Sequence, residues 1–251
     1  MCETCGCGDP HLVPVEVQDR ILAVNERQAR HNREHFAESG VLSVNLMGSP
    51  GAGKTAVLEA TARALAGRLR LGALAGDLAT DNDANRLKAA GIPSLSITTG
   101  SACHLDAEMV HKALHGFPWR EVDYLFIENV GNLVCPAVYD LGQAVNVVAL
   151  SVTEGSDKPL KYPVMFRGAD LVLLTKIDLV PHLPGTSLAA YEDSLARVMP
   201  RFEAFHVSAT TGEGIDRWTA WLEARRAAAR PTVPGDHHHH HEHAHERETR
   251  S

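Results

Sequence analysis

Several features that mark common classes of protein are scarce or missing in this sequence. Its 251 residues include five cysteines, an odd number that argues against a disulfide framework and favours metal binding or free thiols. No apolar run approaches the length that crosses a bilayer. Basic residues number 24 against 31 acidic ones, and the net charge of −7 argues against nucleic acid as the main partner.

The first residues also lack the basic segment and the apolar core of a secretory signal peptide. We therefore expect a cytoplasmic protein in a reducing compartment, with no membrane partner. A chain of this length can bury one full core, so we expect a single domain with extensions at both ends.

Strand-like and helix-like patterns alternate from residue 41 onward. The strand-like runs are mostly continuous and apolar, which is typical of a sheet covered on both faces. They predict strands over 41–47, 72–76, 94–98, 124–128, 145–152, 171–175 and 203–207. The helical patterns lie over 54–68, 81–90, 105–115, 187–199 and 212–229. This alternation predicts an α/β fold with a mostly parallel, doubly wound sheet and helices on both faces.

The segment Gly48-Ser49-Pro50-Gly51-Ala52-Gly53-Lys54-Thr55 joins the first predicted strand to the first helix of this region. Strand, G-x-x-x-x-G-K-T and helix in succession are typical of a phosphate-binding P-loop, in which Lys54 supplies charge and the Thr55 hydroxyl ligates Mg²⁺. The alternative is a glycine-rich turn without a ligand, and the number of matched positions argues against it. The candidate nucleotide-binding residues here are Gly48, Gly51, Ala52, Gly53, Lys54, Thr55 and Ala56.

The segment 171–178 is an apolar strand that ends in T-K-x-D and resembles the N-K-x-D guanine motif of G proteins. Asp178 is placed to accept hydrogen bonds from guanine, and the stem of Lys176 to lie along the base. Thr175 replaces the usual Asn. Ser208-Ala209 resembles the S-A-x motif on the far side of the base. An ordinary strand end with a surface Lys and Asp is the alternative; together with the P-loop, the two motifs favour GTP over ATP.

Two carboxylates follow predicted strands at the edge where the P-loop lies. Asp77 ends one strand and Glu128 another, and ligands of open α/β sheets bind at this edge. We predict that Asp77, with Thr55, binds Mg²⁺ or orients the attacking water, and that Glu128 senses the γ-phosphate. Lys54, Asp77 and Glu128 are the candidate catalytic residues. The alternative for either acid is a helix N-cap or loop carboxylate.

The cysteines fall into two groups. Cys2, Cys5 and Cys7 offer three thiols within six residues near a free amine, which suits square-planar Ni²⁺ or tetrahedral Zn²⁺. Incidental cysteines at a chain end are the alternative. Cys103-His104 and Cys135 lie in loops at the nucleotide end of the sheet, and spacing alone favours small buried side chains over a metal site.

These patterns divide the chain into four segments. We predict a Cys-rich metal-binding segment over 1–14, an N-terminal helix over 15–40, a P-loop GTPase domain over 41–230, and a disordered His-rich tail over 231–251. The tail histidines suit weak binding of Ni²⁺, Zn²⁺ or Co²⁺. Their interruption by Glu and Ala favours a native tail over a purification tag.

Taken together, the sequence resembles the hydrogenase nickel-incorporation GTPase family, HypB. The segments that carry the resemblance are Cys2–Cys7, the P-loop, 76–83, Cys103-His104, 128–136 and 154–159. The resemblance implies a SIMIBI-type G domain and a GTPase that forms a homodimer with GTP. It also implies delivery of nickel, with other nickel-insertion accessory proteins, to the large-subunit precursor of [NiFe]-hydrogenase.

The resemblance also implies roles for particular residues. It assigns a high-affinity nickel site to Cys2, Cys5 and Cys7, and it reverses the interpretation of Cys103, His104 and Cys135, which become a Ni²⁺/Zn²⁺ site at the dimer interface. Lys158, with Lys161 as the alternative, resembles a lysine that reaches the nucleotide across the dimer. Three other functions stay open: a nickel storage protein, a urease nickel-insertion GTPase, and a P-loop ATPase or kinase.

Overall fold

The computed structural model describes residues 15–100 and 102–229. Its centre is a seven-stranded sheet in which every neighbouring pair of strands is parallel, in the order β3-β2-β4-β1-β5-β6-β7. The strands are β1 (Leu42–Met47), β2 (Leu71–Asp77), β3 (Ser94–Thr98), β4 (Tyr124–Glu128), β5 (Val145–Ser151), β6 (Leu171–Thr175) and β7 (Ala204–Val207). Because parallel strands end at one edge, the loops that follow β1, β2, β4 and β6 meet there.

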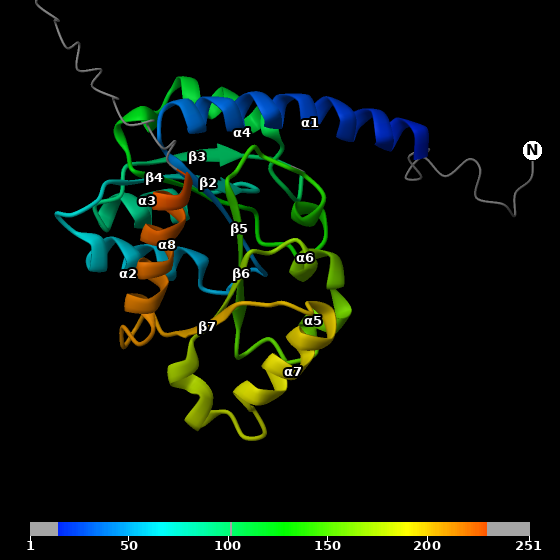
Figure 1. Ribbon diagram of the computed structural model, residues 1–251, viewed down its shortest axis with the longest axis vertical. Coiled ribbons are helices and arrows are strands. Elements are labelled where there is room, and N and C mark those ends of the chain that lie inside the picture. Colours follow the sequence, from blue (N-terminus) through cyan, green and yellow to red (C-terminus); the bar gives the residue numbers. More distant parts are fainter. Residues whose placement is uncertain (1–14, 101, 230–251) are drawn as a thin grey trace, which may run out of the picture.

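Helices cover both faces of this sheet (Figure 1). They are α1 (Val15–Glu38), α2 (Lys54–Leu65), α3 (Asn82–Ala89), α4 (Ala107–His115), α5 (Lys158–Lys161), α6 (Pro163–Arg167), α7 (Leu188–Val198) and α8 (Ile215–Ala229). Among the described helices, none combines the length and the apolar character that a membrane span needs.

Alternate side chains of each strand point to opposite faces and build separate parts of the core. In β4, Tyr124 and Phe126 join a cluster with α2, α3 and α8, whereas Leu125 and Ile127 pack toward α1 and α4. A third cluster lies on the sheet face that α1 and α4 also cover, and it packs β5 and β6 against α6 and α7. Buried Trp218 of α8 donates a hydrogen bond from Nε1 to the Thr61 hydroxyl of α2, 2.9 Å away.

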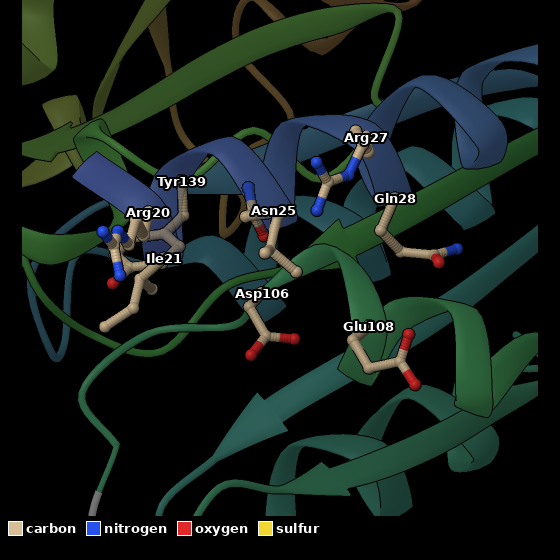
Figure 2. A pocket seen from close by; sticks show the side chains of 9 residues that line it. Arg20, Ile21, Asn25, Arg27, Gln28, Asp106, Glu108 and Tyr139 are labelled. Atoms are coloured by element: carbon tan, nitrogen blue, oxygen red, sulfur yellow. The ribbon is translucent and has the colours of Figure 1, made fainter. Parts of the chain in front are cut away.

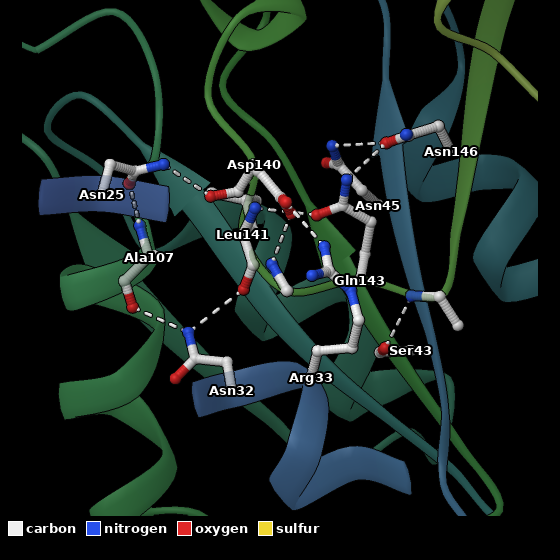
Figure 3. Close-up of polar contacts among 12 residues, drawn as sticks. Asn25, Asn32, Arg33, Ser43, Asn45, Ala107, Asp140, Leu141, Gln143 and Asn146 are labelled. Carbon is white, nitrogen blue, oxygen red and sulfur yellow. Dashed lines mark hydrogen bonds and ion pairs between the residues drawn. The ribbon is translucent and has the colours of Figure 1, made fainter. Parts of the chain in front are cut away.

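Helix α1 is held on the domain by two buried amide side chains (Figure 3). Asn32 Nδ2 donates to the carbonyl oxygens of Ala107 and Leu141, at 2.9 and 3.1 Å. Asn25 accepts a hydrogen bond from the Ala107 backbone N–H and donates to the Asp140 carbonyl, both at 2.8 Å. These contacts fix α1 against the start of α4 and against the loop before β5.

The predicted elements agree with the structure to within a few residues at their ends, and the predicted parallel sheet with helices on both faces is confirmed. The prediction missed two short helices, α5 and α6, because Pro159, Pro163 and Gly168 break any long helical pattern there. Each proline occupies the first or second position of its helix, where its missing N–H costs no hydrogen bond. Residues 1–14 and 231–251, predicted as a metal-binding segment and a tail, lie outside the described residues.

Candidate functional site

The loop between β1 and α2 has the tight backbone that its glycines predict. Gly48 has a φ of 148°, and a Cβ there would lie 2.4 Å from the carbonyl oxygen of Ala149 on β5. Gly53 has a φ of 92° and immediately precedes α2. Glycine is the residue that adopts these positive φ values without strain. The loop therefore passes close to the sheet and presents the N-terminus of α2 to the cavity.

Lys54 lies folded into this loop. Its side chain is buried, and Nζ donates to the carbonyl oxygens of Gly48 and Ser49 at 3.3 and 3.4 Å. Burial lowers the pKa of Lys54, and the carboxylates of Glu128 and Asp83 oppose that change. A buried cation beside a helix N-terminus favours an anionic ligand such as a phosphate.

Thr55 brings two acidic side chains together. Its Oγ1 lies 2.9 Å from Asp83 Oδ1 of α3 and 2.7 Å from Glu128 Oε1 at the end of β4. The single hydroxyl hydrogen of Thr55 cannot donate a full hydrogen bond to both carboxyl groups. Burial raises the pKa of Glu128 to about 7, against the attraction of Lys54. Glu128 Oε2 is buried and has no hydrogen-bond partner among the described residues.

This arrangement of oxygen atoms fits a hard divalent cation. A hydroxyl and two carboxylates converge on one point, and one buried carboxylate oxygen is unpaired. Mg²⁺ takes oxygen ligands of this kind, usually one or two carboxylates with water and phosphate. The donors present therefore fit the predicted magnesium ion, although Asp83 had not been singled out by the sequence.

Asp77 has a different set of contacts. Its Oδ1 accepts hydrogen bonds from the backbone N–H groups of Ala79 and Thr80, at 2.9 and 2.8 Å. These bonds lower the pKa of Asp77, so it stays ionised at neutral pH. The carboxylates in hydrogen-bond contact with Thr55, within the described part of the chain, are Asp83 and Glu128 rather than Asp77. Asp77 faces the same cavity from the end of β2.

These groups line a cavity of about 490 Å³ at the carboxyl edge of the sheet. Predicted residues in its wall are Gly51, Gly53, Lys54, Thr55, Ala56, Asp77, Glu128 and Lys176. The wall also includes Asp83, Arg86, Asn129 and Gly131, to which the sequence patterns gave no role. Gly48, Ala52, Asp178, Ser208 and Ala209 do not line it directly.

The predicted base-binding residues are tied to the P-loop and to each other. Thr175 Oγ1 donates to the Ala52 carbonyl at 2.6 Å, and Lys176 Nζ donates to the Gly51 carbonyl at 2.7 Å. Thr175 thus makes a direct hydrogen bond to the P-loop in the position where the usual motif has Asn. Ser208 Oγ donates to Asp178 Oδ1 at 2.6 Å, which brings the two sequence motifs together.

The structure also brings together Cys103, His104 and Cys135, which spacing alone had favoured as ordinary buried side chains. Their ligand atoms all lie within 4.8 Å of one another, and the two sulfur atoms are 2.9 Å apart. The His104 ring stacks on Tyr139, with centroids 3.8 Å apart. Burial lowers the pKa of His104, which favours the neutral imidazole that metals bind. Two thiols and an imidazole suit Zn²⁺ or Ni²⁺.

One loop, residues 129–135, touches both sites. Asn132 forms a β-bridge with Gly48 of the P-loop, and its side chain donates to the Cys103 carbonyl at 3.2 Å. Gly131 packs so tightly on the P-loop that a Cβ there would lie 2.8 Å from the backbone nitrogen of Pro50. The same loop ends at Cys135. The path from the phosphate cavity to the thiol cluster is therefore a single short segment.

Comparison with known proteins agrees with this geometry. A sequence model of the family CobW/HypB/UreG, nucleotide-binding domain, matches residues 42–206. The hydrogenase maturation factor HypB of Rhizobium leguminosarum bv. viciae is 49% identical over 216 residues, which are 85% of this chain and 72% of that protein. The chain belongs to the HypB family of hydrogenase maturation factors. The resemblance drawn from the sequence motifs is thus confirmed.

Two solved structures of the HypB family share the fold. HypB from Helicobacter pylori in complex with nickel is 36% identical with a TM-score of 0.77, and the match covers 84% of this chain and 99% of that one. HypB from Archaeoglobus fulgidus is 38% identical with a TM-score of 0.75, covering 81% and 99%. The predicted P-loop fold, with its parallel sheet and helices on both faces, is confirmed.

A second cavity, of about 580 Å³, lies along α1 beside the thiol cluster of this HypB-family chain (Figure 2). Figure 2 shows Arg20, Ile21 and Asn25 of α1 on one side and Asp106 and Tyr139 close by. Because the Tyr139 ring lines this cavity and stacks on His104, a molecule in the cavity would border the candidate metal site.

Two predicted features stay predictions. The Lys158 ammonium lies 5.5 Å from the centroid of the Tyr162 ring and does not line the nucleotide cavity of its own chain. The thiols of Cys2, Cys5 and Cys7 lie outside the described residues.

Proposed function

We propose that this chain is a GTP-hydrolysing nickel metallochaperone that delivers nickel during [NiFe]-hydrogenase maturation. The observation that carries the proposal is the 129–135 loop, which contacts the P-loop and ends in the candidate metal cluster. A change in phosphate contacts at one end of this loop is positioned to alter thiol geometry at the other. Local changes of this kind are how nucleotide switches act on distant sites.

The nucleotide-binding part of the proposal follows from the cavity. The P-loop amides and Lys54 would hold the phosphates, while Asp178 and Lys176 would select and cover guanine. Guanine donates hydrogen bonds to the Asp178 carboxylate that adenine does not offer in the same arrangement, and the absence of these bonds with adenine gives a preference for GTP over ATP.

The hydrolytic groups surround Thr55. Thr55 and Asp83 would hold Mg²⁺, with Asp77 within the same cavity as a further ligand or as the group that orients water. The ion would supply positive charge to the phosphates. Glu128, with a pKa of about 7, can hold or release a proton near neutral pH at the place where the γ-phosphate is expected. Lys54 would balance the negative charge of the outer phosphates.

Nickel is the cargo in this proposal. Cys103, His104 and Cys135 offer three ligands, and a second copy of the chain would complete the shell in a GTP-dependent homodimer. Zn²⁺ suits the same ligands. Lys158 is available to reach the partner's nucleotide. Hydrolysis would loosen the dimer and release nickel to another accessory protein or to the hydrogenase large-subunit precursor. Cys2, Cys5 and Cys7 are proposed as a separate, tighter nickel site.

The test is hydrogenase activity in cells that lack their own copy of the protein and carry a variant instead. Lys54→Ala removes the phosphate-binding charge, and Cys103→Ala removes a thiol of the proposed cluster. Lys88→Ala, an exposed lysine of α3, is the matched control. We expect Lys54→Ala and Cys103→Ala to lose hydrogenase activity and Lys88→Ala to retain it. Normal activity with Lys54→Ala would favour the storage function and contradict GTP-driven delivery.

A further inference from the structure

Four histidines gather where α1 packs on α4, away from the thiol cluster. We call them the α1–α4 histidine cluster, and its members are His31, His35, His111 and His115. Each helix contributes a pair spaced i and i+4, which places both rings of the pair on one helix face. The same spacing supplies the two zinc-binding histidines of an H-E-x-x-H helix.

The distances between the rings match those around one metal ion. The centroids are 4.2 Å apart for His31 and His35, 5.2 Å for His31 and His111, and 4.9 Å for His111 and His115. With a metal–nitrogen distance of about 2.1 Å, two imidazoles on one tetrahedral ion place their centroids about 5 Å apart. Three of the ring pairs are thus near ligand spacing, while His35 and His111 are 6.2 Å apart, and the interplanar angles of 55° to 83° leave the ring faces crossed rather than stacked.

The backbone beneath the cluster is fixed. Asn32, between the two histidines of α1, is fully buried and bonds the carbonyl of Ala107 at the start of α4. A cation bound here would therefore meet a prepared pair of helices instead of having to assemble them, which lowers the entropic cost of binding.

One ring of the cluster also presents an unpaired nitrogen. Nδ1 of His111 is buried and has no hydrogen-bond partner among the described residues. A neutral imidazole with a free nitrogen is the form that binds transition metals.

We propose that the α1–α4 histidine cluster is a binding site for a late first-row divalent cation, of the class Ni²⁺, Cu²⁺ or Zn²⁺. Such ions favour imidazole ligands, whereas Mg²⁺ and Ca²⁺ favour oxygen. Within the described residues, the trio whose ligand atoms already lie within 4.8 Å is Cys103, His104 and Cys135. In the histidine cluster, the side chains would rotate to bring their nitrogen atoms onto the ion. His31 and His115 are exposed, so their rings are free to rotate in this way.

The site ties α1 to α4, and α4 begins just after the Cys103-His104 loop. A bound ion would thus hold the N-terminal helix on the domain, on the helix that follows the proposed nickel cluster but through different residues. It does not depend on GTP or on the thiols, so it stands even if the proposed function fails.

Residue-level protection is the first test. The wild-type full chain is treated with diethylpyrocarbonate, with and without Zn²⁺, and the modification of each histidine is followed by peptide mass spectrometry. We expect Zn²⁺ to slow the modification of His31 and His115 at least about tenfold, since a bound nitrogen is not nucleophilic. His182, an exposed histidine of the 177–182 segment, is the internal control and should react at an unchanged rate. Equal rates at His31 with and without Zn²⁺ would overturn the proposal.

A local reporter gives the second test. The Trp119 ring lies 6.2 Å from that of His35, whereas Trp218 and Trp221 stack on each other in α8. Cu²⁺ bound at the cluster should quench the fluorescence of Trp119. In the Trp119→Phe variant, the quenching that comes from this residue should therefore be absent. His111→Gln should lower the Cu²⁺ affinity obtained from the quenching titration by about tenfold or more. Loss of a group that only orients a metal ligand already lowers metal affinity by about that factor. His182→Gln should leave it unchanged. Quenching that survives His111→Gln unchanged would place the ion elsewhere and refute the site.

Discussion

Glu128 offers the sharpest test of the electrostatics in the nucleotide cavity. Its carboxyl group is 3% exposed, and burial raises its pKa from 4.5 to about 7 in the protein without ligand. An ionised Glu128 therefore opposes folding at neutral pH. We predict that Glu128→Gln, which keeps the shape and removes the charge, makes the ligand-free protein more stable at pH 8.

The magnitude follows from linkage between proton binding and folding. Between pH 4.5 and about 7 the folded chain keeps a proton at Glu128 that the unfolded chain has released, so the free energy of unfolding falls as pH rises through this window. One pKa unit corresponds to about 1.4 kcal/mol, so above pH 7 the free energy of unfolding is lower by about 3 kcal/mol than it is below pH 4.5. A change of that size corresponds to a rise in Tm of about 6–12 °C for the Gln variant at pH 8.

The assay is urea unfolding at pH 5 and pH 8, with a chelator present and no nucleotide. The stability difference between Glu128→Gln and wild type should be about 2.5 kcal/mol larger at pH 8 than at pH 5, because most of the linkage loss falls between these pH values. Glu121→Gln changes an exposed glutamate and should stay within about 0.5 kcal/mol of wild type at both pH values. A Gln variant no more stable than wild type at pH 8 would refute the reasoning.

Three further substitutions test separate contacts of the site. Gly131→Ala places a Cβ against the Pro50 backbone, so we expect nucleotide binding, measured with a fluorescent GDP analogue, to weaken at least about tenfold. Asp178→Ala should lower GTP affinity at least about tenfold in a competition titration and leave ATP affinity unchanged; loss of both would contradict its role at the base. Asn132→Ala removes the bond to the Cys103 carbonyl and should reduce the effect of nucleotide on nickel affinity. Val134→Ala, an exposed side chain of the same loop, should retain that effect.

The fold was predictable because its signals are local. Each strand is a short apolar run, and the P-loop fixes both its glycines and the start of the next helix, at which Lys54 and Thr55 line the cavity. The short helices α5 and α6 were missed because two prolines within five residues leave no periodic pattern to read.

The contacts that couple the site were not predictable in the same way. Asp83 closes the segment 76–83, which begins at the end of β2 and also contains Asp77. The sequence places acidic residues near the cavity, but it does not show which of them contacts Thr55. That choice depends on how α3 packs. The histidine pairs of α1 and α4 are likewise separate in sequence and meet only through helix packing. Such pairings depend on tertiary structure, which local patterns do not record.

The central claim is that the nucleotide held by the P-loop controls the metal held by the thiol cluster. Its most direct test is a nickel titration against a competing chelator, with the full chain bound to a non-hydrolysable GTP analogue or to GDP. Comparison with Cys103→Ala/Cys135→Ala isolates the contribution of this cluster from other nickel ligands in the chain. The account predicts a nickel affinity that differs between the two nucleotides in wild type and is equal in the double variant. The same nickel affinity with both nucleotides in wild type would contradict it.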